Sequence, residues 1–321
     1  MADNLPTPAV SIDEKDKRIL YELDLDARQS ISQMAKKLRL NKGVVAYRIK
    51  RLEESGVIKS YYPMIDYSKL GFFGLRIYTK FTSANSDEEK EIIDFFVKSK
   101  HTWWVGTIDG EYSLGAVFWV KRMSDFYGFW NEFKKRYHHL LSQTVVSIYN
   151  SVYDLNYTFL VPDGKRTYSH VGLSPQVGVS RTELATLNAL SEDARAPITA
   201  ISRKAGLSPV TIQRAIRTLK RKGIVRGFRP LLDLNKLGVV YYKLNVYVKD
   251  YGQLDKMVKY ALHHPNAIYV NEAIGYADFE MEVLTRSHEE FRQIFGDFKA
   301  KFQETIRDAD YFVYSRIHKI V

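Results

Sequence analysis

Apolar residues recur at the three- to four-residue spacing of an α-helix in three short segments near the beginning of the chain. Such stripes predict three amphipathic helices that each bury one face. Asn41 is placed to cap the third helix and Gly56 to end it, and the next residues alternate as a β-strand pair does. The three stripes consist of Ile19, Leu20 and Leu23, then Ile31, Met34, Ala35 and Leu38, then Val45, Ile49 and Leu52.

A second pattern follows, in which strand-like runs alternate with amphipathic helical segments. It begins with an aromatic and β-branched run, which is typical of a strand. The order β-α-β-β-α-β predicts a ferredoxin-like sandwich. Its segments are a strand at 72–82, a helix at 87–100, two strands joined near Gly110, a helix at 124–138 and a strand at 144–160.

Both patterns occur twice. A shift of 167 residues aligns residues 26–71 with 193–238 without a gap, and a period of this length indicates duplicated domains. In the second copy Ser208 and Pro209 begin the third helix, which buries Ile212, Ile216 and Leu219. The second sandwich is predicted from segments at 239–248, 253–264, around Gly275, 287–303 and 307–320.

Charge and composition narrow the function. Lys and Arg outnumber Asp and Glu by 48 to 37, giving a net charge of +11, which favours nucleic acid as a partner and an anionic membrane surface second. Cysteine is absent, which excludes disulfides, cysteine metal sites and thiol nucleophiles. No signal peptide and no run of about 18 apolar residues is found, so we expect a cytoplasmic, nucleoid-associated protein with no membrane partner.

The third helix of each copy is basic on the face opposite its apolar stripe. In each copy a strand pair follows this helix as a wing, which predicts a winged helix-turn-helix whose third helix enters the major groove of double-stranded DNA. The alternative is a solvated basic helix without a nucleic-acid partner. The predicted DNA-binding residues are Arg28, Lys42, Tyr47, Arg48, Lys50, Arg51 and Lys59 in the first copy, and Arg195, Gln213, Arg214, Arg217, Lys220, Arg221, Lys222 and Arg226 in the second.

The predicted fold is therefore α+β, a winged helix-turn-helix followed by a ferredoxin-like βαββαβ sandwich, with the whole unit repeated twice. We call residues 13–161 copy one and residues 180–321 copy two. The predicted domains are a flexible tail at 1–12, winged helix-turn-helix domains at 13–66 and 180–233, sandwich domains at 67–161 and 234–321, and a linker at 162–179.

The first copy resembles the N-terminal domain of the Lrp/AsnC transcription regulators. The resemblance rests on Asp16 and Ile19, on Asp26-Ala27-Arg28, on the run Arg48 to Glu53, and on Gly56-Val57-Ile58. It implies a DNA-binding regulator whose sandwiches pair across a two-fold axis as effector and oligomerisation domains, with an amino acid as the candidate effector. Because this chain carries two copies, its sandwiches are expected to pair within one chain. Assembly of several such chains into a homo-oligomer is an additional possibility.

Two departures from the family pattern bear on the function. Copy two has Ala215 where copy one keeps Arg48, and the strand turn near the effector pocket ends in Asp278 in copy two but in Ser113 in copy one. The candidate effector-binding residues are therefore Gly275 and Asp278, with Gly110 and Ser113 as their weaker counterparts. The alternative for Asp278 is a turn aspartate satisfied by local backbone.

Two other functions remain open. The sirohaem decarboxylases share this two-part architecture, and His101 and His138 could serve such an enzyme; a nucleoid-compacting protein that binds DNA without sequence choice is the other. We expect no enzyme, no catalytic residues and no cofactor. We also expect no metal, since the adjacent pairs His138–His139 and His263–His264 point about 100° apart on a helix and are poorly placed to share one ion.

Overall fold

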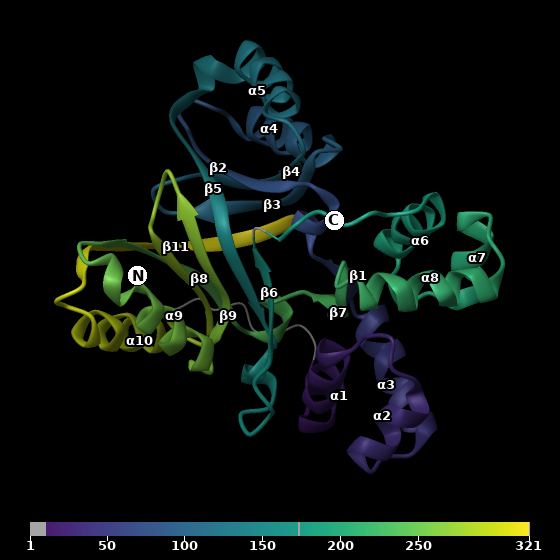
Figure 1. The fold of residues 1–321 in the computed structure, drawn as a ribbon. Coiled ribbons are helices and arrows are strands. Elements are labelled where there is room, and N and C mark those ends of the chain that lie inside the picture. Colours follow the sequence, from purple (N-terminus) through teal and green to yellow (C-terminus); the bar gives the residue numbers. More distant parts are fainter. Residues whose placement is uncertain (1–10, 173, 321) are drawn as a thin grey trace. The chain divides into compact units, whose positions relative to one another are not determined.

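The computed structural model describes residues 11–172 and 174–320 and divides the chain into two compact units. The helix-turn-helix unit comprises residues up to Leu70, Asn156–Ser169 and Gln176–Val239. The sheet unit comprises Gly71–Leu155, His170–Pro175 and the residues from Val240 onward. Each unit takes one part from each copy, so equivalent domains of the two copies belong to the same unit (Figure 1).

The predicted domain boundaries differ from this division at the linker. The structure forms a strand, β6 (Tyr168–Gly172), inside the predicted linker 162–179 and pairs it with a strand of the sheet unit. Residues 156–169, which the prediction divides between the first sandwich and the linker, belong to the helix-turn-helix unit, where the Tyr157 amide donates to the buried Asp24 at 2.6 Å. The predicted tail 1–12 lies outside the described residues except for its last two.

Three helices and one strand from each copy make the helix-turn-helix unit. Most of its helices begin at a capping side chain, as when Asn41 accepts from the Gly43 amide and Ser208 from the Thr211 amide. Copy one contributes α1 (Glu14–Leu25), α2 (Ile31–Leu38), α3 (Lys42–Glu54) and β1 (Ile58–Ile65). Copy two contributes α6 (Arg181–Glu192), α7 (Ile198–Ala205), α8 (Pro209–Arg221) and β7 (Val225–Leu232).

The predicted strand pair of each wing is wrong, because each copy supplies one strand, and this strand joins the two copies of the unit. Strands β1 and β7 pair antiparallel, and backbone bonds on both sides of the pair are reciprocal, because each bond from copy one to copy two has a counterpart in the opposite direction. This reciprocity shows that an approximate two-fold axis relates the two copies within one chain. The reciprocal bonds run from Ala27 N to Phe228 O and from Ala194 N to Tyr61 O, and from Asp66 N to Ile224 O and from Asp233 N to Val57 O.

The sheet unit contains both predicted sandwiches. In copy one the elements are β2 (Phe73–Phe81), α4 (Ser86–Lys98), β3 (Thr102–Asp109), β4 (Leu114–Val120), α5 (Met123–Tyr137) and β5 (Leu141–Leu155). In copy two they are β8 (Val240–Val248), α9 (Leu254–His263), β9 (Ala267–Ile274), β10 (Phe279–Thr285), α10 (His288–Lys301) and β11 (Ile306–Ile320). The predicted β-α-β-β-α-β order is thus present in each copy.

The two sandwiches pair within this unit, as expected for a duplicated chain. Strand β5 pairs with β2 of its own copy and then with β9 of copy two, and β11 pairs with β8 and then with β3 of copy one. The pairings close into a ring in the order β2-β4-β3-β11-β8-β10-β9-β5, with β6 added beside β5. Among the strands that the structure describes, no sheet edge is left between the two copies in this ring.

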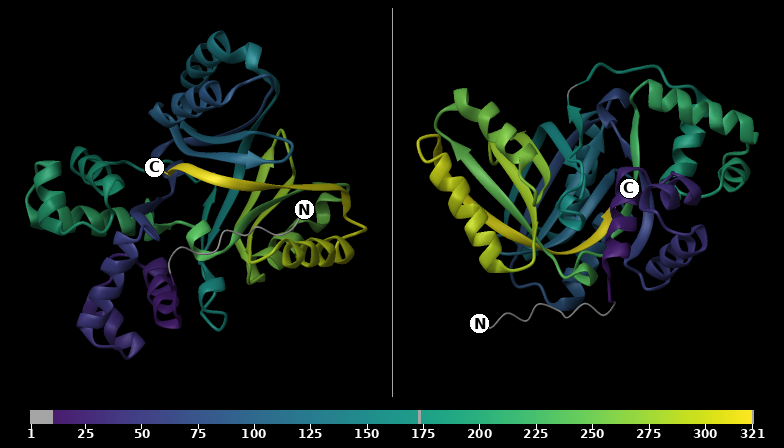
Figure 2. Two further views of the ribbon diagram at one scale, coloured as in Figure 1. Left: turned by 180° about the vertical axis from the view of Figure 1, so that it is seen from behind. Right: turned by 90° about the horizontal axis from the view of Figure 1, so that it is seen from below.

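Each sandwich buries its own apolar core between strands and helices. Helices α4 and α5 cover the strands of copy one, and α9 and α10 cover those of copy two (Figures 1 and 2). Both cores contain several phenylalanines, with Phe96, Phe118 and Phe133 in copy one and Phe279 and Phe298 in copy two fully buried. Among the described residues, no helix has the length and apolar character needed to cross a bilayer.

Candidate nucleic-acid interface

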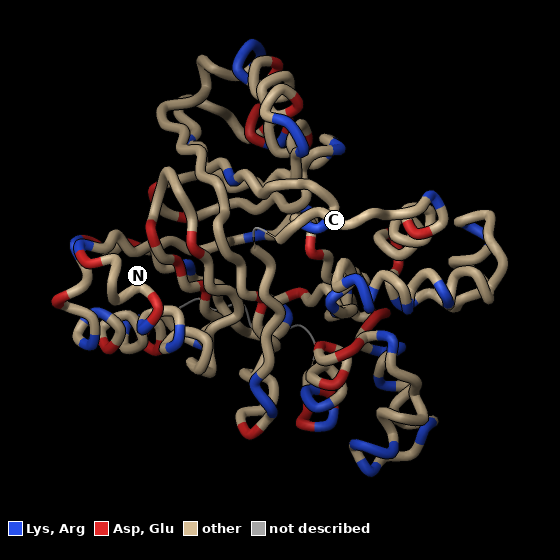
Figure 3. Tube along the Cα trace, in the orientation of Figure 1, with Lys and Arg blue, Asp and Glu red and all other residues tan. Residues whose placement is uncertain are grey.

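Helix α8 presents a basic face to solvent. Its N-cap is Ser208 and its first residue is Pro209, so the helix begins at a fixed point and its face is defined from the first turn. Ile212, Ala215 and Leu219 are buried on one side. The opposite side exposes Val210, Gln213, Arg214, Arg217, Lys220 and Arg221, and basic residues follow one another along this helix in Figure 3.

The cations of α8 have few partners of their own. Within the described part of the chain, none of Arg214, Arg217, Lys220 and Arg221 forms an ion pair, although the Arg217 side chain donates to the Gln213 carbonyl at 3.4 Å. The Lys220 ammonium lies 4.9 Å from the centre of the Phe228 ring. Four exposed cations without acidic neighbours on one helix face form a surface that suits phosphate and guanine.

Helix α3 presents a less charged face, because two of its arginines turn inward. Arg48 contacts Asp13 and Asp16 at 2.8 Å each, and Arg51 also pairs with Asp16, which is fully buried. Partial burial acts to raise the pKa of Asp13, but the Asp16 amide and the Arg48 guanidinium together lower it to about 2. Arg48 and Arg51 therefore hold α3 against α1.

The exposed part of α3 is led by an aromatic residue. Tyr47 is 69% exposed, and Lys42 and Lys50 are exposed on the same helix. Lys50 lies 3.5 Å from Glu54, a surface pair that holds it weakly. The two reading helices therefore differ in kind, since α3 offers a tyrosine with two lysines and α8 offers a glutamine with arginines.

The departure at Ala215 has a structural reason. Its counterpart Arg48 reaches an acid on α1, whereas Ala215 is buried in the helix packing of copy two. In copy two the equivalent acid is Glu183, and the Lys222 ammonium reaches it at 2.8 Å from beyond the end of α8. The N-terminal helix of copy two is thus tied to the end of the recognition helix and leaves the middle of α8 free of ion pairs among the described residues.

Four further predicted DNA-binding residues lie at the junction of the two copies. Arg28 donates to the carbonyls of Ala194 and Ala196, and Arg195 donates reciprocally to those of Ala27 and Gln29. Lys59 pairs with Asp233 at 3.0 Å, and Arg226 pairs with Asp66 at 3.1 Å. Sequence periodicity could not assign these contacts, because each partner lies in the other copy.

The candidate effector residues occupy equivalent turns in the sheet unit. Asp278 accepts a hydrogen bond from the Val248 amide at 2.9 Å and another from the Tyr251 hydroxyl. Ser113 accepts from the Phe81 amide at 3.0 Å in the same position of copy one. Gly110 and Gly275 precede them with φ of +147° and +99°, a conformation that favours glycine. Both side chains therefore have local backbone partners.

The histidines considered for an enzyme do not converge. The Arg122 guanidinium and, to a smaller extent, the nearby His101 ring lower the pKa of Asp125 in the first turn of α5. His138 follows the last turn of α5, with Nδ1 3.4 Å from the Lys134 ammonium. A helix of 15 residues spans about 20 Å, so the two rings lie at opposite ends of it. Among the described residues, no group of three or more metal-ligating side chains gathers.

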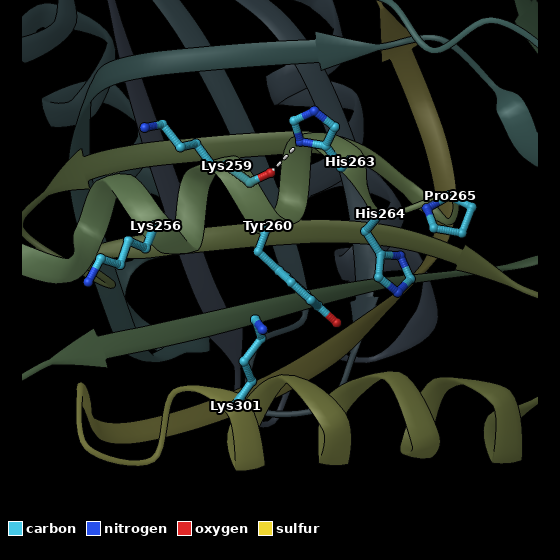
Figure 4. Close-up of a pocket in the computed structure, with 7 residues that line it drawn as sticks. All are labelled: Lys256, Lys259, Tyr260, His263, His264, Pro265 and Lys301. Atoms are coloured by element: carbon cyan, nitrogen blue, oxygen red, sulfur yellow. Dashed lines mark hydrogen bonds between the residues drawn. The ribbon is translucent and has the colours of Figure 1, made fainter.

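The sequence did not predict a basic hollow on copy two. It has a volume of about 540 Å³ and is formed by α9, the turn after it and the end of α10 (Figure 4). Glu91 and Asp94 lie on the equivalent helix of copy one, whereas the described residues that line this hollow include no acid. The lining residues are Lys256, Lys259, Tyr260, His263, His264, Pro265 and Lys301.

Comparisons with known proteins agree with the duplicated architecture. A winged helix-turn-helix DNA-binding family matches residues 12–59 and 179–226. An uncharacterised HTH-type transcriptional regulator of Pyrococcus furiosus is 33% identical over 108 residues, which cover 34% of this chain and 72% of the relative. The HTH-type transcriptional regulator LrpA of Pyrococcus horikoshii is 34% identical over 117 residues, covering 36% of this chain and 79% of LrpA.

Solved structures of one protein match nearly the whole chain. The siroheme decarboxylase NirDL aligns with a TM-score of 0.60 over 96% of this chain and 93% of its own length, at 13% identity. A likeness at this level of identity shows a shared fold. The likeness extends across both copies.

Proposed function

The chain belongs to the Lrp/AsnC family of DNA-binding HTH-type transcription regulators, and on this premise we propose that a single chain acts as a pseudo-dimer that reads an asymmetric operator. A homodimer carries two identical reading helices and reads a near-palindrome. Here α3 and α8 take the equivalent positions, yet their exposed side chains differ. This difference is the observation that carries the proposal.

The proposed roles follow from the chemistry of the exposed side chains. Arginine matches the acceptors of guanine and glutamine matches the adenine edge, so Arg214, Arg217 and Gln213 are the candidates for base contacts in one half-site. Tyr47 is the candidate in the other half-site. Lys42, Lys50, Lys220 and Arg221 are candidates for phosphate contacts, which set affinity rather than sequence. Copy two then supplies more of the affinity.

The residues at the junction of the copies are given a different role. Arg28, Arg195, Lys59 and Arg226 support the pairing of the two winged domains through their contacts across it. Arg48, Arg51 and Lys222 support the packing of each domain through their acidic partners. Their contribution to DNA binding is then indirect, through the position of α3 and α8. On this proposal the site of action is the cytoplasmic nucleoid.

Selection of binding sites from random duplex DNA tests the proposal. The expected sites have two dissimilar halves, separated by one helical turn or a multiple of it. Arg217→Ala is expected to relax one half only, and Tyr47→Ala the other. Arg136→Ala, which removes a surface pair with Glu132 in the sheet unit, serves as the matched control. Recovery of a perfect palindrome that both variants affect equally would contradict the asymmetric reading.

A sirohaem-binding enzyme is the second candidate, favoured by the fold shared with NirDL. His101 and His138 stand at opposite ends of α5, which does not support their joint use on one tetrapyrrole. The test is the absorption spectrum of added sirohaem, which we expect the protein to leave unchanged. A bound spectrum that His101→Ala or His138→Ala alters would favour the enzyme.

A further inference from the structure

Four charged side chains are buried together inside the sheet unit. Arg76 donates twice to Glu280, and the Lys243 ammonium contacts Glu280 and Glu282 at 2.7 Å each. These four residues, called the buried charge set, are between 0% and 6% exposed. Charges removed from water in this way are tolerated only when they are paired and hydrogen-bonded. The positive and negative charges of the set therefore have to cancel within the protein interior.

The two copies contribute to this set unequally. Arg76 on β2 and Lys243 on β8 occupy equivalent positions, but both acids come from β10 of copy two. The strand register identifies the counterparts of the two acids in copy one. Lys243 lies opposite Glu282, and its counterpart Arg76 lies opposite Val117. Asn245 lies opposite Glu280, and its counterpart Tyr78 lies opposite Gly115. Copy one has therefore no acid at either position.

The shape of copy one keeps an acid out of one of these positions. A Cβ atom on Gly115 would approach the Tyr78 ring to 3.0 Å, which is closer than carbon atoms normally pack. Tyr78 is fully buried and also lies under the Arg76 guanidinium, 4.6 Å from the ring centre. The tyrosine occupies the space in copy one that the Glu280 side chain requires in copy two.

The consequence is a balance of charge that only unlike faces achieve. Copy one brings one positive charge, and copy two brings one positive and two negative charges, a net of −1. Paired together they sum to zero. Two faces of copy one would bury two positive charges without an acid, and two faces of copy two would bury a net charge of −2, both of which are strongly unfavourable in the interior.

We propose that the buried charge set selects the partner of each sheet face, so that copy one pairs only with a face that carries the two acids of copy two. The partner surface is defined by the Arg76 guanidinium of copy one against the Glu280 carboxylate of copy two, while Glu282 pairs with Lys243 of its own copy. Pairing of like copies from different chains is excluded, and every assembled sheet unit then holds one copy of each kind. This stands on the sheet unit alone and does not depend on DNA binding.

Charge exchange in the full-length chain tests this selection. Arg76→Glu and Glu280→Arg are each expected to lower the melting temperature by roughly 10 °C or to give insoluble protein, since each buries a net charge. The double variant Arg76→Glu/Glu280→Arg is expected to recover much of this loss. Arg136→Glu, at an exposed ion pair with Glu132, is the control and should leave the melting temperature within about 2 °C of the wild type.

Co-expression of the two single variants with different affinity tags examines partner choice directly. In a crossed dimer, the Arg76→Glu site of one chain meets the Glu280→Arg site of the other in one sheet unit. The unchanged Arg76 and Glu280 meet in the second sheet unit, so both units become neutral. The expected result is soluble, co-purifying protein of twice the chain mass, where each variant alone fails.

Two results would overturn the proposal outright: wild-type stability of the single variants, or a double variant no more stable than either of them. Recovery of the double variant without co-purification of the two single variants would overturn partner selection and leave a structural ion cluster.

Discussion

Arg217 and Arg48 are both arginines of a recognition helix, yet their replacement should have opposite consequences. Arg217 is exposed on α8 and forms no ion pair among the residues that the structure describes. Arg48 is held at 2.8 Å by Asp13 and Asp16. We expect Arg217→Ala to weaken DNA binding with unchanged stability, and Arg48→Ala to lower stability with a small effect on DNA binding.

The magnitudes follow from these contacts. Loss of a base-contacting arginine costs about 1–3 kcal/mol of binding, a roughly 5- to 150-fold weaker affinity. Loss of Arg48 removes charge-assisted hydrogen bonds to the buried Asp16, whose pair with Arg51 remains. We therefore expect Arg48→Ala to lower the folding stability by about 1–2 kcal/mol. If Lys42, Lys50, Lys220 and Arg221 each neutralise one phosphate, the slope of log affinity against log salt is about −3.6 and affinity falls about 150-fold between 50 and 200 mM salt.

Fluorescence anisotropy on a selected duplex at several salt concentrations, together with thermal denaturation of each variant, measures both effects. Lys220→Ala is expected to reduce the salt slope by about 0.9 without changing sequence preference. The reasoning is refuted if Arg48→Ala weakens binding as much as Arg217→Ala while its melting temperature stays at the wild-type value. A nearly flat salt dependence would equally contradict the assigned phosphate contacts.

Three further outcomes are expected. Arg28→Ala and Arg195→Ala should each destabilise the junction of the two winged domains by about 1–3 kcal/mol, seen as faster amide exchange in β1 and β7; equal exchange to the wild type would contradict this. The folded-state pKa of Asp13 is lowered to about 2, so its contribution, about 1 kcal/mol for this half-exposed pair, is present above about pH 4 and lost as the pH falls toward 2. Asp13→Asn should remove that acid-dependent loss in a urea titration. If Asp278 receives the amino group of an effector, calorimetry with the standard amino acids should show heat of binding that Asp278→Ala abolishes. No heat with any amino acid would contradict the expected effector site.

The sequence alone was sufficient for the elements and their duplication. Apolar stripes, caps such as Asn41 and Ser208, and a gap-free repeat define the three helices and the β-α-β-β-α-β order twice, whereas the strand pair predicted in each wing forms only between the two copies. These features are local, because the period of a helix or strand and the chemistry of a cap depend on residues a few positions apart. The basic face of α8 was visible for the same reason.

Which basic side chains face solvent and which face the protein was decided by tertiary structure. Arg48 and Arg217 look alike in a helical pattern, but Arg48 meets Asp16 on another helix. Arg28 meets carbonyl groups 166 and 168 residues away, and Arg76 meets Glu280 across 204 residues. Such contacts depend on which copy pairs with which, and the interior charge balance that favours unlike copies exists only once both sheets are folded together.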